Sequence, residues 1–110
     1  MRKKTNREIG DQYEKEIAEE LGGKLIQGSG SIRERKEDID FPKMRMQVKS
    51  TSKESISITL KDLYHLEEHA MDCGKIPAYL FAVGGKKAEW IAFPLWMIED
   101  LEWFKKLRSH

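Results

Sequence analysis

A β-hairpin is predicted by residues 38–50, which read DIDFPKMRMQVKS. Both arms alternate apolar and polar residues with period two, as half-buried strands do, and a turn around Pro42 joins them. The apolar face of the hairpin holds Ile39, Phe41, Met46 and Val48. The polar face holds Asp38, Asp40, Gln47 and Lys49. The apolar face is therefore expected to pack against helices.

The register of this hairpin depends on the length of its turn. With four residues in the turn, Asp40 lies opposite Gln47 and Asp38 lies opposite Lys49, because directly paired residues share a face. A register shifted by two residues keeps the same four polar side chains together, whereas a shift of one separates them. Two carboxylates, an amide and an ammonium are thus expected on one patch.

Two aspartates on one face of a hairpin call for an explanation. Asp is disfavoured inside strands, and two carboxylates on one face repel each other. An ordinary solvated surface is one interpretation, and a divalent cation that offsets the repulsion is the other. Carboxylate and amide oxygens are suitable ligands for Mg²⁺, and a lysine ammonium beside them would lie near the water or the scissile phosphate of a hydrolytic site.

Length and composition limit the class of protein. The chain has 110 residues and a formal net charge of +1, so we expect a single domain over residues 1–110, and the overall charge does not indicate nucleic acid. The lone Cys73 excludes an intramolecular disulfide and suits a reducing, cytoplasmic location. His65 and His69 are four residues apart but have no third ligand nearby, so a zinc site is not expected. No apolar run suits a signal peptide or a membrane span.

The other elements are predicted from periodicity and from the positions of Gly and Pro. Residues 1–8 are expected to form a mobile basic arm. Helices are expected over residues 11–21, 59–73 and 94–107. Strands are expected over residues 24–27, 38–41, 46–50, 77–83 and 88–92, with a brief edge at 56–58. The predicted order is α-β-β-β-α-β-β-α, which indicates an α/β fold.

The C-terminal region is rich in large apolar side chains. They are Trp90, Ile91, Phe93, Leu95, Trp96, Ile98, Leu101, Trp103, Phe104 and Leu107. A small domain covers only one side of a terminal helix, so an apolar arc this wide is expected to leave a contact surface exposed. Aromatic residues are enriched at interface centres, which favours a homodimer through this region. The alternative is that the aromatic side chains close a small core.

The ordered set of polar residues resembles the PD-(D/E)XK nuclease superfamily, and within it the archaeal-type Holliday junction resolvases, including phage members. The resemblance spans residues 8–83 and rests on Glu14, the Gly28-Ser29-Gly30-Ser31 loop, Asp38-Ile39 and Gln47-Val48-Lys49-Ser50. It implies a restriction-endonuclease-like mixed β-sheet flanked by helices. It also implies Mg²⁺-dependent DNA hydrolysis, with Mn²⁺ as a substitute, by a homodimer that nicks two strands of a four-way junction in the cytoplasm, or the host cytoplasm for a phage protein.

The resemblance assigns roles residue by residue. The catalytic positions are Glu14, Ser29, Asp38, Gln47 and Lys49, with Ser31 as the alternate to Ser29. The implied metal ligands are Asp38, Gln47, the Val48 carbonyl and Glu14. The implied DNA-binding positions lie in the basic arm, in the loop before the hairpin and in the segment after it. They are Arg2, Lys3, Lys4, Arg7, Ser31, Arg33, Arg35, Lys36 and Lys53.

Two positions depart from the family pattern. The second metal ligand of the family is usually Glu, and Gln47 removes one negative charge from the site. The residue two after the aspartate is usually apolar, and here it is Asp40, on the same face. We hypothesise that Asp40 and Gln47 jointly replace the glutamate and that Asp40 is a further metal ligand; the alternative is a solvent-facing Asp40. A nuclease for flaps, mismatches or duplex ends, and a DNA-binding module without catalysis, stay open.

Overall fold

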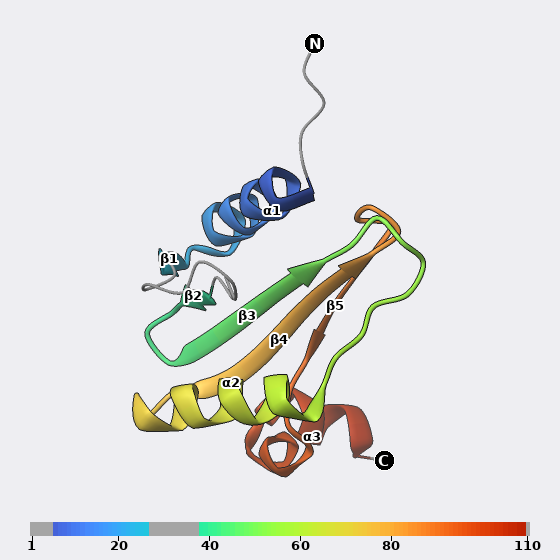
Figure 1. The fold of residues 1–110 in the computed structure, drawn as a ribbon. Helices are drawn as coiled ribbons and strands as arrows, with labels where there is room; N and C mark the ends of the chain where they lie inside the picture. Colours follow the sequence, from blue (N-terminus) through green and yellow to red (C-terminus); the bar gives the residue numbers. More distant parts are fainter. Residues whose placement is uncertain (1–5, 27–37, 110) are drawn as a thin grey trace.

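Helices pack on both faces of one mixed β-sheet in the computed structural model, which describes residues 6–26 and 38–109 (Figure 1). Within these ranges, the side chains of residues 6–11, 38, 99 and 100 are not described. The helices are α1 (Asn6–Leu21), α2 (Leu60–Asp72) and α3 (Glu102–Arg108), with a 3₁₀ helix, η1 (Leu95–Asp100). The strands are β1 (Lys24–Ile26), β2 (Asp38–Asp40), β3 (Met44–Ser50), β4 (Ile76–Val83) and β5 (Ala88–Ala92). The predicted α/β class is confirmed.

The five strands lie in the order β1-β2-β3-β4-β5. Neighbouring strands are antiparallel except β3 and β4, which are parallel. Parallel neighbours cannot be joined by a tight turn, so the chain crosses over through α2 between them. This crossover places β3, with its polar residues, in the middle of the sheet.

Helix α1 covers the face of the sheet that the alternation predicts to be apolar. Tyr13 and Ile17 lie one helical turn apart and are buried against Met46 and Val48 of β3. Gly22, with φ of +76°, ends the helix, because few residues other than glycine adopt this left-handed conformation. The full cluster on this face is Tyr13, Ile17, Ala18, Ile39, Met46, Val48, Ala78, Leu80 and Ala82.

Helix α2 covers the opposite face. Its buried residues Leu66 and Ala70 are four apart, and Leu66 lines a small cavity together with Tyr79 of β4. The backbone N–H of Asp62 donates to the side-chain oxygen of Thr59 at 3.1 Å, so Thr59 caps this helix at the residue where the predicted helix begins.

The hairpin of β2 and β3 has a shorter turn than predicted. Asp38 is paired with Gln47 and Asp40 with Arg45, so the prediction of a four-residue turn is wrong by two residues. The N–H of Phe41 donates to the Met44 carbonyl at 2.9 Å, which closes a two-residue loop that begins with Pro42. Proline presets the backbone angle that the first loop position needs. The shift is even, so the predicted faces are retained.

Three other boundaries differ from the sequence prediction. Helix α1 begins at Asn6, inside the predicted arm of residues 1–8, because one glycine within a helix costs only about 1 kcal/mol and Gly10 does not stop it. Residues 56–58, predicted as a brief edge, form no strand. The last predicted helix is divided at Leu101, whose extended backbone separates η1 from α3.

Gly23 has no room for a side chain. A Cβ atom there would lie 2.3 Å from Cγ2 of Ile39 and 2.7 Å from Cζ of Phe41. We therefore expect Gly23→Ala to lower the free energy of unfolding by about 1–3 kcal/mol, measured by urea denaturation. Gly74→Asn is the control, because nothing lies within 4 Å of a Cβ there and asparagine tolerates φ of +66°. Equal stability of Gly23→Ala and the wild type would contradict this packing.

Within the described ranges, none of the helices is long and apolar enough to cross a membrane.

Candidate functional site

The polar positions of β2 and β3 come together on one side of the sheet. The backbone pairs Asp38 directly with Gln47, and Lys49 follows two residues later on β3. Their apolar neighbours Met46 and Val48 are buried against α1, so the side chains of Gln47 and Lys49 leave β3 on the other face. The hairpin thus aligns three of the predicted site residues in sequence and register.

The amide of Gln47 is buried, with only 4% of the residue exposed. Its partner across the parallel strand pair is Tyr79, which is buried as well. A charged carboxylate at such a position would carry a large desolvation cost unless a cation lay beside it. The neutral amide therefore suits this strand position in the absence of a bound cation.

The ammonium of Lys49 donates a hydrogen bond to the backbone carbonyl of Ser57. Ser57 belongs to the linker between β3 and α2, so this bond ties the linker to the strand on the Gln47 side of the sheet. An ammonium has three donors, so two remain for a water or an anion.

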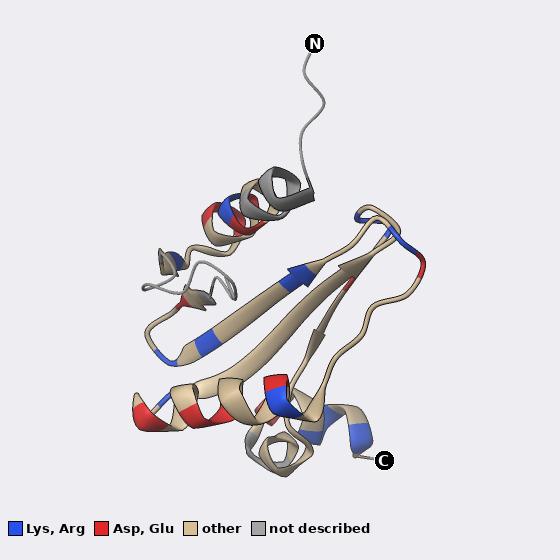
Figure 2. Ribbon diagram, in the orientation of Figure 1, with Lys and Arg blue, Asp and Glu red and all other residues tan. Residues whose placement is uncertain are grey.

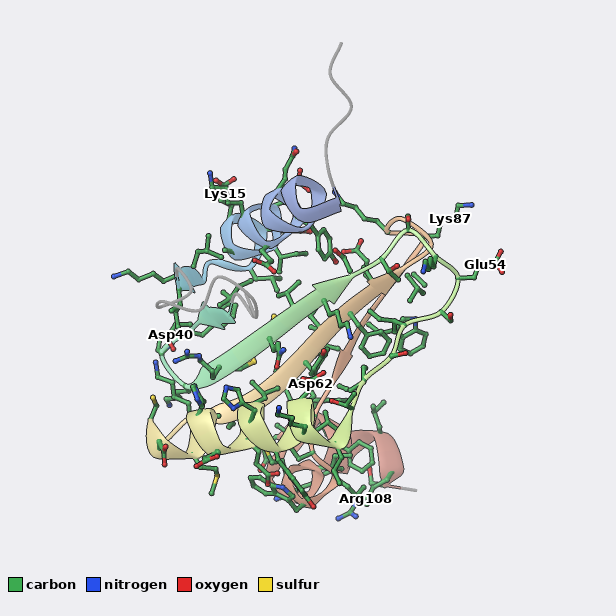
Figure 3. The ribbon with its side chains drawn as sticks, in the orientation of Figure 1. Lys15, Asp40, Glu54, Asp62, Lys87 and Arg108 are labelled. Carbon is green, nitrogen blue, oxygen red and sulfur yellow. The ribbon has the colours of Figure 1, made fainter. Side chains whose placement is uncertain are left out.

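Asp40 has a cation partner that sequence reasoning did not find. Its carboxylate oxygen lies 2.5 Å from the ammonium of Lys75, which stands between α2 and β4. Asp40 is the last residue of β2, next to the turn of the hairpin (Figure 3). The ammonium of Lys75 thus balances the charge of the Asp40 carboxylate. Thirty-five positions of sequence separate Asp40 from Lys75, and no local pattern connects them.

Glu14 lies on the opposite side of β3 from Gln47 and Lys49. It is on α1, whose neighbouring residue Tyr13 packs against Met46 and Val48, and only 8% of Glu14 is exposed. Glu14 is therefore not a solvated residue of the helix surface. The sheet separates Glu14 from the Gln47 face, so the structure does not bring it beside Gln47 or Lys49.

Several predicted residues cannot be placed in the site. Ser29, Ser31 and the predicted DNA-binding residues before the hairpin lie outside the described residues, as does the arm up to residue 5. Arg7 is in α1 rather than in an arm, and its side chain is not described. Lys53 is exposed in the linker after β3. The residues outside the described ranges are Arg2, Lys3, Lys4, Ser29, Ser31, Arg33, Arg35 and Lys36.

Among the side chains that the structure describes, no three His, Cys, Asp or Glu residues lie close enough together to hold a metal ion. The side chain of Asp38 is not among these. His65 and His69 have ring centroids 4.3 Å apart on α2, as their spacing predicts, without a third such ligand in the described part of the chain.

Tyr13 links α1 to the far end of the sheet. Its hydroxyl donates to a carboxylate oxygen of Glu89 on β5 at 2.5 Å. The ammonium of Lys86 lies 5.2 Å from the centre of the Tyr13 ring and 2.6 Å from a carboxylate oxygen of Glu16. Burial, followed by the hydrogen bond to Glu89, raises the pKa of Tyr13 well above its ordinary value.

The raised pKa of Tyr13 predicts loss of stability in alkali. The unfolded chain releases the tyrosine proton near pH 10 while the folded chain keeps it, so stability is complete below pH 10 and falls above it. The expected slope is up to about 1.4 kcal/mol per pH unit. Tyr13→Phe should remove this slope and cost about 1 kcal/mol at neutral pH, measured by urea denaturation between pH 8 and 11.5. Identical slopes in the variant and the wild type would exclude Tyr13 as the cause.

Exposed apolar side chains gather on η1 and α3. Leu95 is 82% exposed, Leu107 73% and Trp103 53%. The indole N–H of Trp96 donates to a carboxylate oxygen of Glu67 at 2.9 Å, which attaches η1 to α2. Leu95, Trp96, Trp103 and Leu107 together form what we call the C-terminal apolar surface. Its exposure agrees with the sequence argument that one small domain cannot cover the whole arc.

Comparison of this chain with family models, with curated proteins and with solved structures finds no match. Its function is therefore argued from its own residues and their geometry.

Proposed function

We propose that this protein is a Mg²⁺-dependent endonuclease of the PD-(D/E)XK type that cuts four-way DNA junctions. The observation that carries the proposal is the strand register, which pairs Asp38 with Gln47 and puts Lys49 two residues further along β3. The same hairpin belongs to a mixed sheet with a helix on each face, as the resemblance implies. A paired acid and amide next to a lysine suit phosphodiester hydrolysis better than they suit a plain solvated surface.

The proposed ligands are chemically suited to Mg²⁺. Asp38, Gln47 and the carbonyl of Val48 are all oxygen donors, which this cation prefers. Glu14 and Asp40 are weaker candidates, because Glu14 lies beyond the sheet and Asp40 is paired with Lys75. When bound, Mg²⁺ lowers the pKa of a water ligand and neutralises charge on the phosphate. A neutral amide in place of a carboxylate makes this a weaker Mg²⁺ site, so millimolar concentrations are the appropriate test condition.

Lys49 supplies the chemistry that belongs to the chain itself. Its ammonium is anchored by the Ser57 carbonyl, which leaves two protons for an attacking water or for a phosphate oxygen. A fixed cation at this point stabilises negative charge that develops on phosphate during hydrolysis.

A DNA-binding module without catalysis is the second candidate. Two observations favour it: Gln47 is neutral and buried, and the carboxylate of Asp40 already has a partner in Lys75. A nuclease site built in this way has one carboxylate fewer than the family pattern. DNA contacts through lysines and arginines would be unaffected by that loss.

A cleavage panel tests the proposal. Four-way junction, flap, mismatch and plain duplex DNA of equal length are incubated with the protein in Mg²⁺, in Mn²⁺ and in a chelator. The proposal predicts metal-dependent nicks in the junction that fall symmetrically on two strands. Cuts confined to flaps, mismatches or duplex ends would assign another nuclease of this fold. Binding with no cut under any condition would assign the silent module.

Asp40 and Lys75 make a separate prediction. If Asp40 supplies the charge missing from Gln47, Asp40→Ala should lower cleavage about 10–100-fold, as losses around metal sites do, and Gln47→Glu should restore much of the loss. Lys75→Met is the matched control, because it breaks the same ion pair but leaves the carboxylate in place. Cleavage rates and urea stability are measured for all four proteins. Equal loss of activity in Asp40→Ala and Lys75→Met would mean that Asp40 serves only the ion pair.

A further inference from the structure

We propose that a pocket at the carboxyl end of β3, on the face of the sheet that α1 covers, binds a backbone phosphate of nucleic acid. The cavity has a volume of about 240 Å³. This terminal pocket is lined by Tyr13, Ser50, Thr51, Ser52, Lys53, Gly85 and Lys86. The inference rests on the proposed nuclease function and adds a contact for the DNA backbone.

Three separate parts of the chain build the terminal pocket. The N–H of Gly85 donates to the Thr51 carbonyl at 3.1 Å, and the N–H of Gly84 donates to the Lys53 carbonyl at 2.7 Å. These bonds attach the turn between β4 and β5 to the linker that leaves β3, and the two lie side by side (Figure 1). Tyr13 of α1 forms the third wall. The walls are therefore fixed by backbone bonds and by a buried ring.

The turn that forms one wall is strained. Gly84, Gly85 and Lys86 are consecutive residues with φ of 64°, 63° and 77°. A left-handed conformation at a residue with a side chain costs roughly 1–2 kcal/mol, and such strain is often found at binding sites. Here it places the Lys86 ammonium over the Tyr13 ring, at the pocket.

Lysines and glutamates both surround the terminal pocket. Lys53 and Lys86 line it, and Figure 2 shows basic and acidic residues at this end of the molecule. Glu16 is paired with Lys86, and Glu89 accepts a hydrogen bond from the neutral hydroxyl of Tyr13. Within the described ranges, the ammonium of Lys53 has no ion pair.

The chemistry of the lining fits a sugar-phosphate unit. Ammonium groups and hydroxyls from Ser50, Thr51 and Ser52 are the usual partners of phosphate oxygens. The methylene stems of the lysines provide an apolar wall for the sugar, and the buried ring of Tyr13 lies behind them. A bare inorganic anion would leave this apolar wall uncovered.

The pocket lies at the same end of β3 as Lys49 but on the other face of the sheet. Ser50, which lines the pocket, directly follows Lys49 on β3, and successive side chains of a strand point to opposite faces. Ser50 therefore faces α1 together with Tyr13, whereas Lys49 is on the Gln47 face. A DNA strand that passes around the carboxyl ends of β3 and β4 would reach both positions. Ligands commonly bind at the carboxyl ends of parallel strands, where β3 and β4 both end.

Binding is tested directly on the full chain by titration with a 5′-phosphorylated thymidine dinucleotide, followed through the amide signals of Ser52 and Gly85. Lys53→Ala should weaken binding about tenfold, because it removes a charge-assisted hydrogen bond. Lys87→Ala is the matched control: it removes the same charge one residue beyond Lys86, from a side chain that points away from the molecule (Figure 3). Its effect should stay below about twofold, the change expected of charge alone.

Lys86→Gly separates binding from folding. It removes an ammonium from the pocket and also releases the left-handed strain, so the melting temperature should stay near that of the wild type while dinucleotide binding weakens. Inorganic phosphate, titrated in parallel, should bind more weakly than the dinucleotide. Unchanged amide signals, equal losses in Lys53→Ala and Lys87→Ala, or phosphate bound as tightly as the dinucleotide would each overturn the inference. A protein that binds the dinucleotide but cuts no DNA would refute the nuclease and leave the pocket standing.

Discussion

Asp38→Asn and Lys49→Ala are each expected to lower the rate of junction cleavage by about a thousandfold, which is the upper range for removing one electrostatic partner of a transition state. Asparagine removes the only carboxylate paired with Gln47 in the strand register. Alanine removes the one ammonium that the Ser57 carbonyl anchors on this face of β3. The rates are measured under single-turnover conditions in Mg²⁺, so that product release does not hide the chemical step.

Junction binding should survive both substitutions, because the proposed phosphate contacts lie elsewhere. Lys43→Ala is the control: it makes the same charge change as Lys49→Ala, in the turn of the same hairpin. Its cleavage rate should match that of the wild type. Full turnover in Asp38→Asn or in Lys49→Ala would remove the site assignment. If Lys49→Ala neither folds nor binds DNA while Asp38→Asn is fully active, then Lys49 has only a structural role.

Trp103→Glu is expected to convert a homodimer into a monomer and to abolish paired cleavage of a junction. On the C-terminal apolar surface, Leu95, Trp103 and Leu107 are 82%, 53% and 73% exposed, and exposed apolar side chains that lie together usually mark a contact surface. We propose a two-fold dimer through this surface, because two active sites related by a two-fold axis match the symmetry of a four-way junction. A buried charge at the centre of such an interface would carry a desolvation cost of several kcal/mol.

Light scattering at micromolar concentration gives the mass of the wild type and of each variant. Met71→Glu is the control, since Met71 is 57% exposed near the end of α2, which lies away from α3 (Figure 1). It should remain dimeric. A monomer mass for the wild type would remove the dimer, and with it the argument for a resolvase over a simpler nuclease. Single nicks by Trp103→Glu on a duplex arm would show that each protomer carries a complete site.

Sequence alone determined the local features of the site. Alternation at period two fixed which residues of the hairpin face α1, because side chains of a strand point to opposite faces whatever the register. The capping residue Thr59 fixed the start of α2 for a similarly local reason, a bond between residues three apart. The limits of β5 were also predicted correctly, from the glycine turn before it.

Tertiary structure decided the partners that lie far apart in the chain. Sequence spacing carries no record of which face of β3 a helix will cover, so Glu14 was grouped with Gln47 although the sheet separates them. The ion pair of Asp40 with Lys75 depends on where α2 ends over the sheet. The bond from Tyr13 to Glu89 joins residues 76 positions apart, and the terminal pocket exists only because that packing brings α1 to the turn between β4 and β5.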